Sequence, residues 1–292
     1  MTDFLEGYSI QSWLTSCPQG YLEGTEYGHE PGQTEPELIV TDPFMKEQAI
    51  SLTVQLVAGE RCALAASAGL IVCAPDEPSK RFLATQTLDE ARHVEIFTQR
   101  LFDLGVKKEE LEDVVAQHAN PNLVKFAETL LEKVGAGDFV AGVVGQNIVL
   151  EGMAFSVFEM LHASMQTGNP KFAKTLTGTI ADERRHVGFG ENRIGSLLEQ
   201  YPEKKPEIQQ MQKEMSHHML ATFADRFRDG AIAEQRQRAR EQLGADATAA
   251  NWKGIDLAAA SPEDLQNTLT NVVLNEFKVR LERLGLEYQT PD

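Results

Sequence analysis

The chain alternates apolar and amphipathic segments with short stretches rich in glycine and proline, and this pattern predicts helices throughout. Within the segments, apolar residues recur every three or four positions, which is the spacing of one helix face. Proline near a start and glycine after an end mark where such helices begin and stop. The predicted helices cover residues 42–73, 79–104, 107–118, 121–134, 138–166, 170–200 and 202–229. Residues 230–292 look helical apart from a loop through 244–254, and no strand pattern appears, so we predict an all-α protein.

The predicted helices form three regions of one domain. Residues 1–40 contain many Gly, Pro, Tyr and Glu residues without a sustained period, so we expect an extended arm lying over the rest of the protein. Residues 41–200 hold the long helices and form the predicted bundle, and residues 201–292 add helices packed on it. A chain of 292 residues can bury a large core, and nothing in its composition forces a second domain.

Two of the predicted helices carry nearly the same polar motif. Residues 89–94 read DEARHV and residues 182–187 read DERRHV, and a lone glutamate precedes each motif by 30 and 32 residues, counted to its glutamate. Residues three apart share a helix face, so each Glu-x-x-His pair points one carboxylate and one imidazole into the same space. The predicted metal ligands are therefore Glu60, Glu90, His93, Glu151, Glu183 and His186.

This set of donors is chemically suited to two metal ions. Two helices that each contribute a Glu and two that each contribute a Glu-x-x-His form the inward-facing ligand set of di-iron and di-manganese bundles. Iron and manganese prefer oxygen and imidazole donors. A single Glu-x-x-His on a soluble helix is usually solvated surface, as we expect for Glu159 and His162, but two copies with matched upstream glutamates favour a metal site.

Charged residues beside the ligands have a supporting role in this prediction. Asp89 and Asp182 each lie one helical turn before a predicted histidine ligand, and metal-bound histidines normally donate their second N–H to a carboxylate or a carbonyl. We expect the aspartates to accept these hydrogen bonds across the bundle, with Arg92 and Arg185 balancing their charge. The six carboxylates and two arginines leave four negative charges, which two divalent ions neutralise.

Composition and charge exclude some classes of function. Hydrophobic content of 42% and charged content of 24% are those of an ordinary soluble globular protein. A formal net charge of −17 argues against nucleic-acid binding, which needs a basic surface. The longest apolar stretch, residues 51–74, is interrupted by Gln55, Glu60 and Arg61, which indicates a buried bundle helix rather than a membrane span.

The compartment is predicted from the cysteines and from the first residues. Cys17, Cys62 and Cys73 are odd in number and lack zinc-finger spacing, which suits a reducing compartment. Residues 1–6 form neither a basic nor an apolar leader region, so no signal peptide is expected. We therefore expect a cytoplasmic protein.

The pattern of ligands and flanking residues resembles the ferritin-like superfamily of dinuclear carboxylate oxidases and oxygenases, which includes the ribonucleotide reductase small subunits. Its motifs are most similar to those of the ligand-binding oxidases in the runs 58–60, 148–153 and 182–186. The resemblance extends over residues 45–200. It implies a ferritin-like four-helix bundle core with additional helices.

Three positions depart from patterns within that superfamily. Phe97 stands where ribonucleotide reductase small subunits carry a radical tyrosine, and Gln146 stands where the ligand-binding oxidases carry a cross-linking tyrosine. Phe155 stands where multicomponent hydroxylases carry a threonine. All five tyrosines lie outside the four ligand helices. We therefore expect neither a tyrosyl radical beside the metals nor the cross-link.

The resemblance implies an O₂-activating oxidase or oxygenase with two iron ions, or one manganese and one iron. The reaction could be hydroxylation, N-oxygenation, desaturation or oxidative C–C cleavage. The protein could also form a homodimer. The alternatives are a ribonucleotide-reductase-type small subunit and a ferroxidase or metal-binding protein without an organic substrate. An external electron donor of the ferredoxin or flavoprotein type is expected. Side chains near the ligands would form a pocket for a small, partly apolar substrate, made of Leu64, Ser67, Phe97, Asn147, Ala154, Phe155, Thr179 and Phe189.

Overall fold

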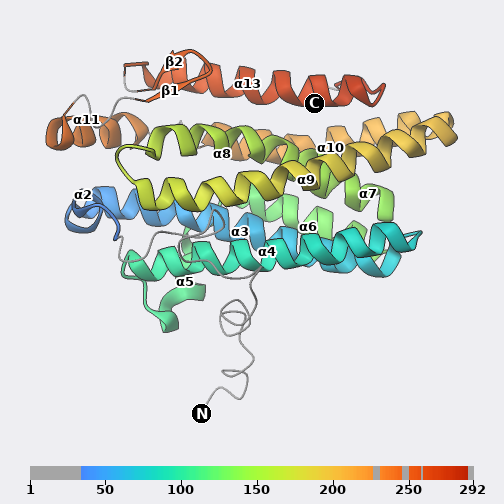
Figure 1. Ribbon diagram of the computed structural model, residues 1–292, viewed down its shortest axis with the longest axis horizontal. Coiled ribbons are helices and arrows are strands. Elements are labelled where there is room, and N and C mark those ends of the chain that lie inside the picture. The colour runs from blue at the N-terminus through green and yellow to red at the C-terminus, as the bar shows by residue number, and fades with distance from the viewer. Residues whose placement is uncertain (1–33, 226–230, 245–249, 258, 289–292) are drawn as a thin grey trace, which may run out of the picture.

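The computed structural model of the chain describes residues 34–225, 231–244, 250–257 and 259–288. The axes of the long helices are nearly aligned along the molecule, and the helices are stacked in layers (Figure 1). The helices are α2 (Glu37–Thr41), α3 (Pro43–Cys73), α4 (Glu77–Asp103), α5 (Leu111–His118), α6 (Pro121–Gly135), α7 (Phe139–Val143), α8 (Glu151–Met165), α9 (Pro170–Gln200), α10 (Lys205–Asp225), α11 (Ala231–Leu243) and α13 (Pro262–Arg283). Short 3₁₀ turns, η3 (Lys108–Glu110) and η5 (Pro202–Lys204), precede α5 and α10.

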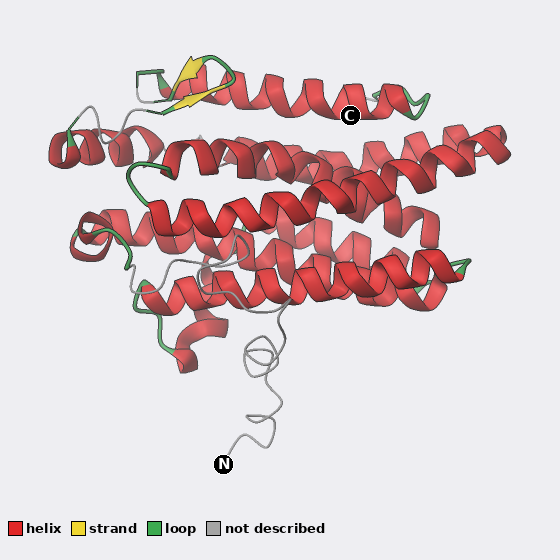
Figure 2. Cartoon of the chain, in the orientation of Figure 1, coloured by secondary structure: helices red, strands yellow, loops and turns green. Residues whose placement is uncertain are grey.

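Four long helices form the centre of the structure. α3 packs along α4, and α8 packs along α9, so the chain builds two hairpins that face each other. α6 and α10 cover the side formed by α3 and the segment before α8, and α13 covers α8. The prediction of an all-α bundle with additional helices is confirmed, and helix dominates the described part of the chain (Figure 2).

Capping residues explain why the central helices begin where they do. The Asp42 carboxylate accepts hydrogen bonds from the backbone N–H groups of Phe44 and Met45, and Pro43 occupies the first turn of α3. Asn169 caps α9 in the same way through the N–H of Phe172. A side chain that accepts from these otherwise unpaired N–H groups stabilises a helix by about 0.5–2 kcal/mol. These starts agree with the sequence prediction.

The prediction that the chain contains no strand is wrong. Residues Asn251–Trp252 (β1) and Ile255–Asp256 (β2) form a small antiparallel hairpin, drawn in yellow in Figure 2. Lys253 and Gly254 both have positive φ, at 50° and 85°, as a tight two-residue hairpin turn requires. Two-residue strands are too short to show an alternating pattern, so periodicity could not reveal them.

The predicted arm and the predicted fifth helix also need correction at their borders. Residues 1–33 lie outside the described residues, but the end of the proposed arm is ordered: residues 37–41 form α2, and Glu35 is buried. The segment predicted as a helix over 202–229 starts with η5, and its last residues lie outside the described part.

Two helical stretches, Pro43–Cys73 and Phe139–Met165, are long and apolar enough to cross a membrane by length and composition alone. In the second, 83% of the apolar window is buried inside the structure. The first carries buried Glu60 and packs against α4, α5 and α6. Both therefore behave as core helices of the bundle, and for residues 51–74 the polar interruptions predicted this.

Candidate metal centre

Six acidic and imidazole side chains converge at the centre of the four long helices. They are Glu60 of α3, Glu90 and His93 of α4, Glu151 of α8, and Glu183 and His186 of α9. All are at most 5% exposed. Their donor atoms fall into two groups, in each of which the atoms lie within 4.8 Å of one another, and Glu90 belongs to both. These are the six residues that the sequence predicted as ligands.

Distances within the cluster describe two positions that share two carboxylates. His93 Nδ1 lies 3.4 Å from Glu60, 3.3 Å from Glu90 Oε2 and 3.4 Å from Glu183 Oε1. His186 Nδ1 lies 3.3 Å from Glu90 Oε1, 3.5 Å from Glu151 and 3.7 Å from Glu183 Oε2. Glu90 and Glu183 thus each direct one oxygen to either position. Both carboxylates would therefore help to hold each of two ions.

The residues present fit a pair of metal ions. Among the described residues, both carboxylate oxygens of Glu90, Oε2 of Glu183 and Nδ1 of His186 are buried without a hydrogen-bond partner. Buried polar atoms are rarely left unsatisfied, so these atoms need another kind of partner. A cluster of four carboxylates and two imidazoles offers the hard oxygen and intermediate nitrogen donors that iron and manganese prefer. The cluster could therefore hold two ions.

The outer nitrogen of each histidine meets the aspartate of the other motif. His93 Nε2 lies 3.1 Å from Asp182, and His186 Nε2 lies 3.2 Å from Asp89. Each pair links α4 to α9 across the bundle. The contacts leave Nδ1 of both rings facing the carboxylate cluster, because a ring that donates through Nε2 presents Nδ1 as its free lone pair.

Two arginines close the charge balance around these aspartates. Arg92 Nη2 lies 2.6 Å from Asp89 and 2.9 Å from Asp182. Arg185, on α9, reaches the same two carboxylates at 2.7 and 2.8 Å. Two arginines and two aspartates therefore form a network of ion pairs outside the histidines. The guanidinium of Arg92 and the imidazole of His93 together hold the pKa of Asp182 down at about 2, although burial of that carboxylate acts in the opposite direction.

Three buried amides bind Glu151. Gln86 and Gln146 donate to Glu151 Oε1 at 2.7 and 2.8 Å, and Asn147 donates to Oε2 at 2.9 Å. Glu60, the corresponding glutamate of the other position, lies 3.4 Å from His93 Nδ1 and receives no hydrogen bond from an amide of the described residues. The two metal positions are therefore not equivalent. Three amide hydrogen bonds hold Glu151 in place, and Glu60 has no such support.

Gln146 is a site residue that the sequence prediction missed. It lies five positions before Glu151, which on an α-helix would place the two side chains on different faces. Residues Val144–Leu150 form a π-helical segment, η4, whose wider turn brings positions five apart onto one face. The sequence signal was the pair of amide side chains, Gln146 and Asn147, within an otherwise apolar run. Amides in such a run are buried, and buried amides need hydrogen-bond partners.

Burial and neighbouring charges raise the pKa of several groups in the metal-free cluster. Burial raises the pKa of Glu60 to about 8, and burial together with the Glu90 charge raises that of Glu183. Burial alone would lower the pKa of His93, but Glu60 and Asp182 outweigh it and raise that pKa well above the usual range. His186 is shifted in the same direction, with Glu151 and Glu90 as the main opposing charges. Metal ions must displace these protons to bind.

We expect the metal-free protein to lose stability as the pH rises from about 5 to about 8, because groups with raised pKa hold protons more tightly when folded than when unfolded. Their contribution is complete below the ordinary values, 4.5 for glutamate and 6.5 for histidine, and is lost as the pH approaches the folded values, about 8 for Glu60. The pKa of Glu90 is lowered, so its contribution is lost only in acid.

Thermal unfolding at several pH values tests this expectation. The Tm of the metal-free protein should fall by several degrees across the window, whereas the metal-loaded protein should show little change because ions replace the protons. A metal-free Tm that rises with pH across the same window would contradict the assignment.

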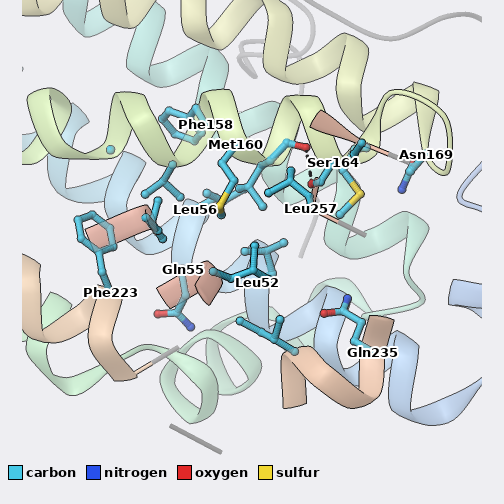
Figure 3. A pocket seen from close by; sticks show the side chains of 18 of the residues that line it. Leu52, Gln55, Leu56, Phe158, Met160, Ser164, Asn169, Phe223, Gln235 and Leu257 are labelled. Carbon is cyan, nitrogen blue, oxygen red and sulfur yellow. Dashed lines mark hydrogen bonds between the residues drawn. The ribbon is translucent and has the colours of Figure 1, made fainter. Parts of the chain in front are cut away.

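A cavity of about 360 Å³ opens from the cluster. Glu60, Glu151 and Glu183 line one part of it, and residues of α2, α3, α6, α8, α10, α11, α13 and the adjoining segments line the rest. Figure 3 shows Leu52, Leu56 and Met160 directed into the same space. The volume lies within the range of roughly 300–1,000 Å³ that is usual for small-molecule sites.

The structure places the predicted pocket residues in different surroundings. Ala154 lines the cavity. The others lie outside its lining, and they are Leu64, Ser67, Phe97, Asn147, Phe155, Thr179 and Phe189. Six of them follow or precede a ligand by about one turn, and Ser67 follows Glu60 by two turns, but such spacing does not fix which neighbouring helix a side chain meets. Phe189 stacks on Phe82 with ring centroids 4.2 Å apart, and Phe155 lies between Arg184 and Arg280.

No protein-family model and no curated protein sequence matches the chain. Solved structures do. An R2-like ligand-binding oxidase with an aerobically reconstituted Mn/Fe cofactor aligns with a TM-score of 0.68 and 15% identity, over 97% of this chain and 94% of that one. The chain has the ferritin-like fold. A Synechococcus protein with aldehyde deformylating oxidase activity aligns with a TM-score of 0.56 and 15% identity, over 83% and 92% of the two chains. The fold that the repeated motif implied is thereby confirmed.

Proposed function

We propose that the protein is an O₂-dependent oxidase or oxygenase with a dinuclear iron, or manganese and iron, centre, acting on a small, partly apolar organic substrate. The observation that carries the proposal is the position of the cavity. Its wall includes three of the ligand carboxylates, Glu60, Glu151 and Glu183, so a bound molecule would lie directly against the metals. The Mn/Fe cofactor of the similar ligand-binding oxidase and the oxidase activity of the Synechococcus protein support it.

Each part of the site has a definite role in this proposal. When bound, two ions would supply the redox chemistry with O₂, using electrons from an external donor. Glu90 and Glu183 would hold both ions together, and the cross-bundle contacts to Asp89 and Asp182 would keep the histidine rings oriented. The amides around Glu151 would fix one side of the centre. The apolar wall would exclude water and position the substrate next to Glu60.

Electron balance requires a reducing partner. If one oxygen atom of O₂ enters the substrate and the other leaves as water, two electrons must come from outside, and desaturation with full reduction of O₂ to water has the same requirement. We therefore infer an external electron donor of the ferredoxin or flavoprotein type. Hydroxylation, N-oxygenation, desaturation and oxidative C–C cleavage are the reactions to be distinguished, and we place the protein in the cytoplasm.

Turnover of the protein with its own metals tests the proposal. The site is reduced, O₂ is added with and without apolar acids, amines and aldehydes, and oxygen consumption and product mass are followed. A product that contains added oxygen or lacks two hydrogens supports an enzyme. If no compound accelerates oxidation and oxidised iron accumulates far beyond two ions per chain, the protein is a ferroxidase instead.

Oxygen exposure of the reduced protein should give no stable tyrosyl radical. Phe97 is fully buried in the core beside Phe158, with ring centroids 6.5 Å apart, at the position where a reductase small subunit carries its tyrosine. In the described part of the chain the tyrosines are Tyr201 and Tyr288, which lie after the four ligand helices. Electron paramagnetic resonance after mixing with O₂ is the measurement. A persistent tyrosyl spectrum would instead favour the reductase-subunit alternative.

A further inference from the structure

The two positions of the metal cluster have the same kinds of ligand. The supported position has Glu151 and His186, and the open position has Glu60 and His93. Two further glutamates direct one oxygen to each position. The number and the charge of the ligands are therefore the same on both sides.

The charged groups outside the ligands are matched as well. The outer nitrogen of each histidine lies 3.1 or 3.2 Å from the aspartate of the other motif. Arg92 and Arg185 each contact both of these aspartates. The three amides that donate to Glu151 are therefore the main difference between the two positions.

Contacts with the surrounding helices orient these amides. Gln86, Gln146 and Asn147 are completely buried. Asn147 Nδ2 donates to Glu151 Oε2 at 2.9 Å and to Gln86 Oε1 at 3.1 Å. The backbone carbonyl of His186 is a third acceptor, at 3.2 Å. Because three acceptors surround this nitrogen, the amide cannot turn over without losing all of them, and the Glu151 carboxylate is held in one orientation.

The π-helical segment η4 brings a second amide of the same helix to this carboxylate. The backbone N–H of Glu151 donates to the carbonyl of Gln146, five residues earlier, so the two residues lie one wide turn apart. In an α-helix the residue one turn before Glu151 would be Asn147 alone. The π-helical turn thus adds the hydrogen bond of Gln146 to that of Asn147.

The other half of the cluster shows what happens without such a turn. Gln55 also stands five residues before its glutamate, Glu60, but on the regular α-helix α3. Its side chain donates to the carbonyl of His118 and accepts from the backbone N–H of Asn120. Gln55 therefore holds the connection between α5 and α6 and gives no hydrogen bond to Glu60.

The amides of the supported position are costly to the fold. Oε1 of Gln146 and Oδ1 of Asn147 are buried without a hydrogen-bond partner among the described residues, and such acceptors lower stability. Asn147 also needs Gly190 beside it, because a Cβ at position 190 would lie 2.5 Å from the Asn147 Cβ. Glycine inside a helix lowers stability again. Apolar side chains at 146 and 147 would avoid these costs, so the amides have a role other than folding.

Hydrogen bonds from the amides prepare Glu151 to bind one ion. A glutamate side chain loses conformational freedom when it is ordered, and Glu151 is already ordered by three donors in the folded protein. An ionised carboxylate has about four lone-pair sites, so three amides leave few for a metal. Glu60 receives no such hydrogen bond, so it must be ordered when an ion binds.

We propose that Gln86, Gln146 and Asn147 are positioning residues that make the supported position bind the first metal ion. The open position takes the second ion and holds it more weakly. This inference rests on the dinuclear centre of the proposed function, but not on its chemistry with O₂. Its consequence is that the ion at the open position is the one that exchanges with ions in solution.

Anaerobic titration of the metal-free full chain with Mn²⁺ tests the order of binding. Electron paramagnetic resonance counts the free ion. His93→Ala keeps the histidine of the supported position only, and His186→Ala keeps that of the open position only. We expect His93→Ala to bind its ion at least tenfold more tightly, because hydrogen bonds to metal ligands typically change metal affinity by about 10–100-fold.

Gln146→Leu, added to each of these two variants, tests the amide itself. Leucine has a similar volume but no N–H group, so Mn²⁺ affinity should fall about tenfold at the supported position and stay unchanged at the open position. Gln86→Leu removes another donor to Glu151 and should act in the same way. Gln55→Leu is the matched control, because it removes an amide five residues before Glu60 that does not contact that carboxylate. It should change neither affinity.

The possible results separate this inference from the proposed function. Equal affinity at the two positions, or tighter binding by His186→Ala, would overturn the order. Equal losses at both positions after Gln146→Leu would show that the amide supports only the fold, and would overturn its positioning role. Ordered binding by a protein that oxidises no organic compound would keep this inference and reject the oxygenase, whereas oxidation by a centre with two equal positions would do the reverse.

Discussion

Glu90→Ala should remove at least one of two metal ions per chain and abolish O₂ reduction. Glu90 directs one carboxylate oxygen to each histidine Nδ1, at 3.3 Å in both cases, and neither oxygen has a hydrogen-bond partner among the described residues. No other side chain reaches both positions as evenly, because the matching distances from Glu183 are 3.4 and 3.7 Å. His186→Ala should lose the ion on its own side.

Elemental analysis of protein purified with its own metals measures this directly. His162→Ala is the control, since His162 belongs to a Glu-x-x-His sequence whose ring contacts Thr177 near the surface instead of the cluster. It should retain two ions. Thermal unfolding should follow the metal content, because a ligand present at about a thousand times its Kd stabilises a fold by roughly 4 kcal/mol. Retention of both ions by Glu90→Ala and His186→Ala would refute the ligand assignment.

The metal cluster was predictable because its signal is repeated in the sequence. Helical periodicity places Glu90 with His93, and Glu183 with His186, on one helix face. A lone glutamate in an apolar helix is costly to bury unless it binds a metal or another charged group. The chemistry of metal-bound imidazole also predicted acceptors at Asp89 and Asp182, and the structure places each of them beside the histidine of the other motif. Helical spacing alone is therefore enough to predict ligands that lie three residues apart on one helix.

The cavity was not predictable in the same way. Its wall combines residues of α3 and α8 with residues of α10, α11 and α13, which lie far away in the sequence. Which side of a bundle helix borders a cavity depends on how neighbouring helices pack, and periodicity alone does not determine that. The π-helical turn before Glu151 is a second example, because it shifts Gln146 onto the ligand face by one position.

Ala154→Phe should abolish substrate-dependent oxygen consumption while leaving two metal ions in place. Ala154 lies three residues after Glu151 on α8 and lines the cavity next to the cluster. A phenyl ring there fills space that the substrate needs but removes no donor atom. Added volume in a packed interior typically costs about 1–3 kcal/mol of stability, which a bundle of this size tolerates. The expected rate is that measured without any substrate.

Ala65→Phe provides the control, because Ala65 is exposed on α3 and the same side chain added there leaves the cavity unchanged. It should keep the parent rate and metal content. Oxygen consumption and elemental analysis are measured on the same preparations, so a loss of turnover can be separated from a loss of metal. If Ala154→Phe oxidises substrate at the parent rate, the substrate approaches the metals by a route other than this cavity. If it loses metal as well, the added ring has displaced Glu151, and the smaller change Ala154→Val then decides whether cavity volume alone controls turnover.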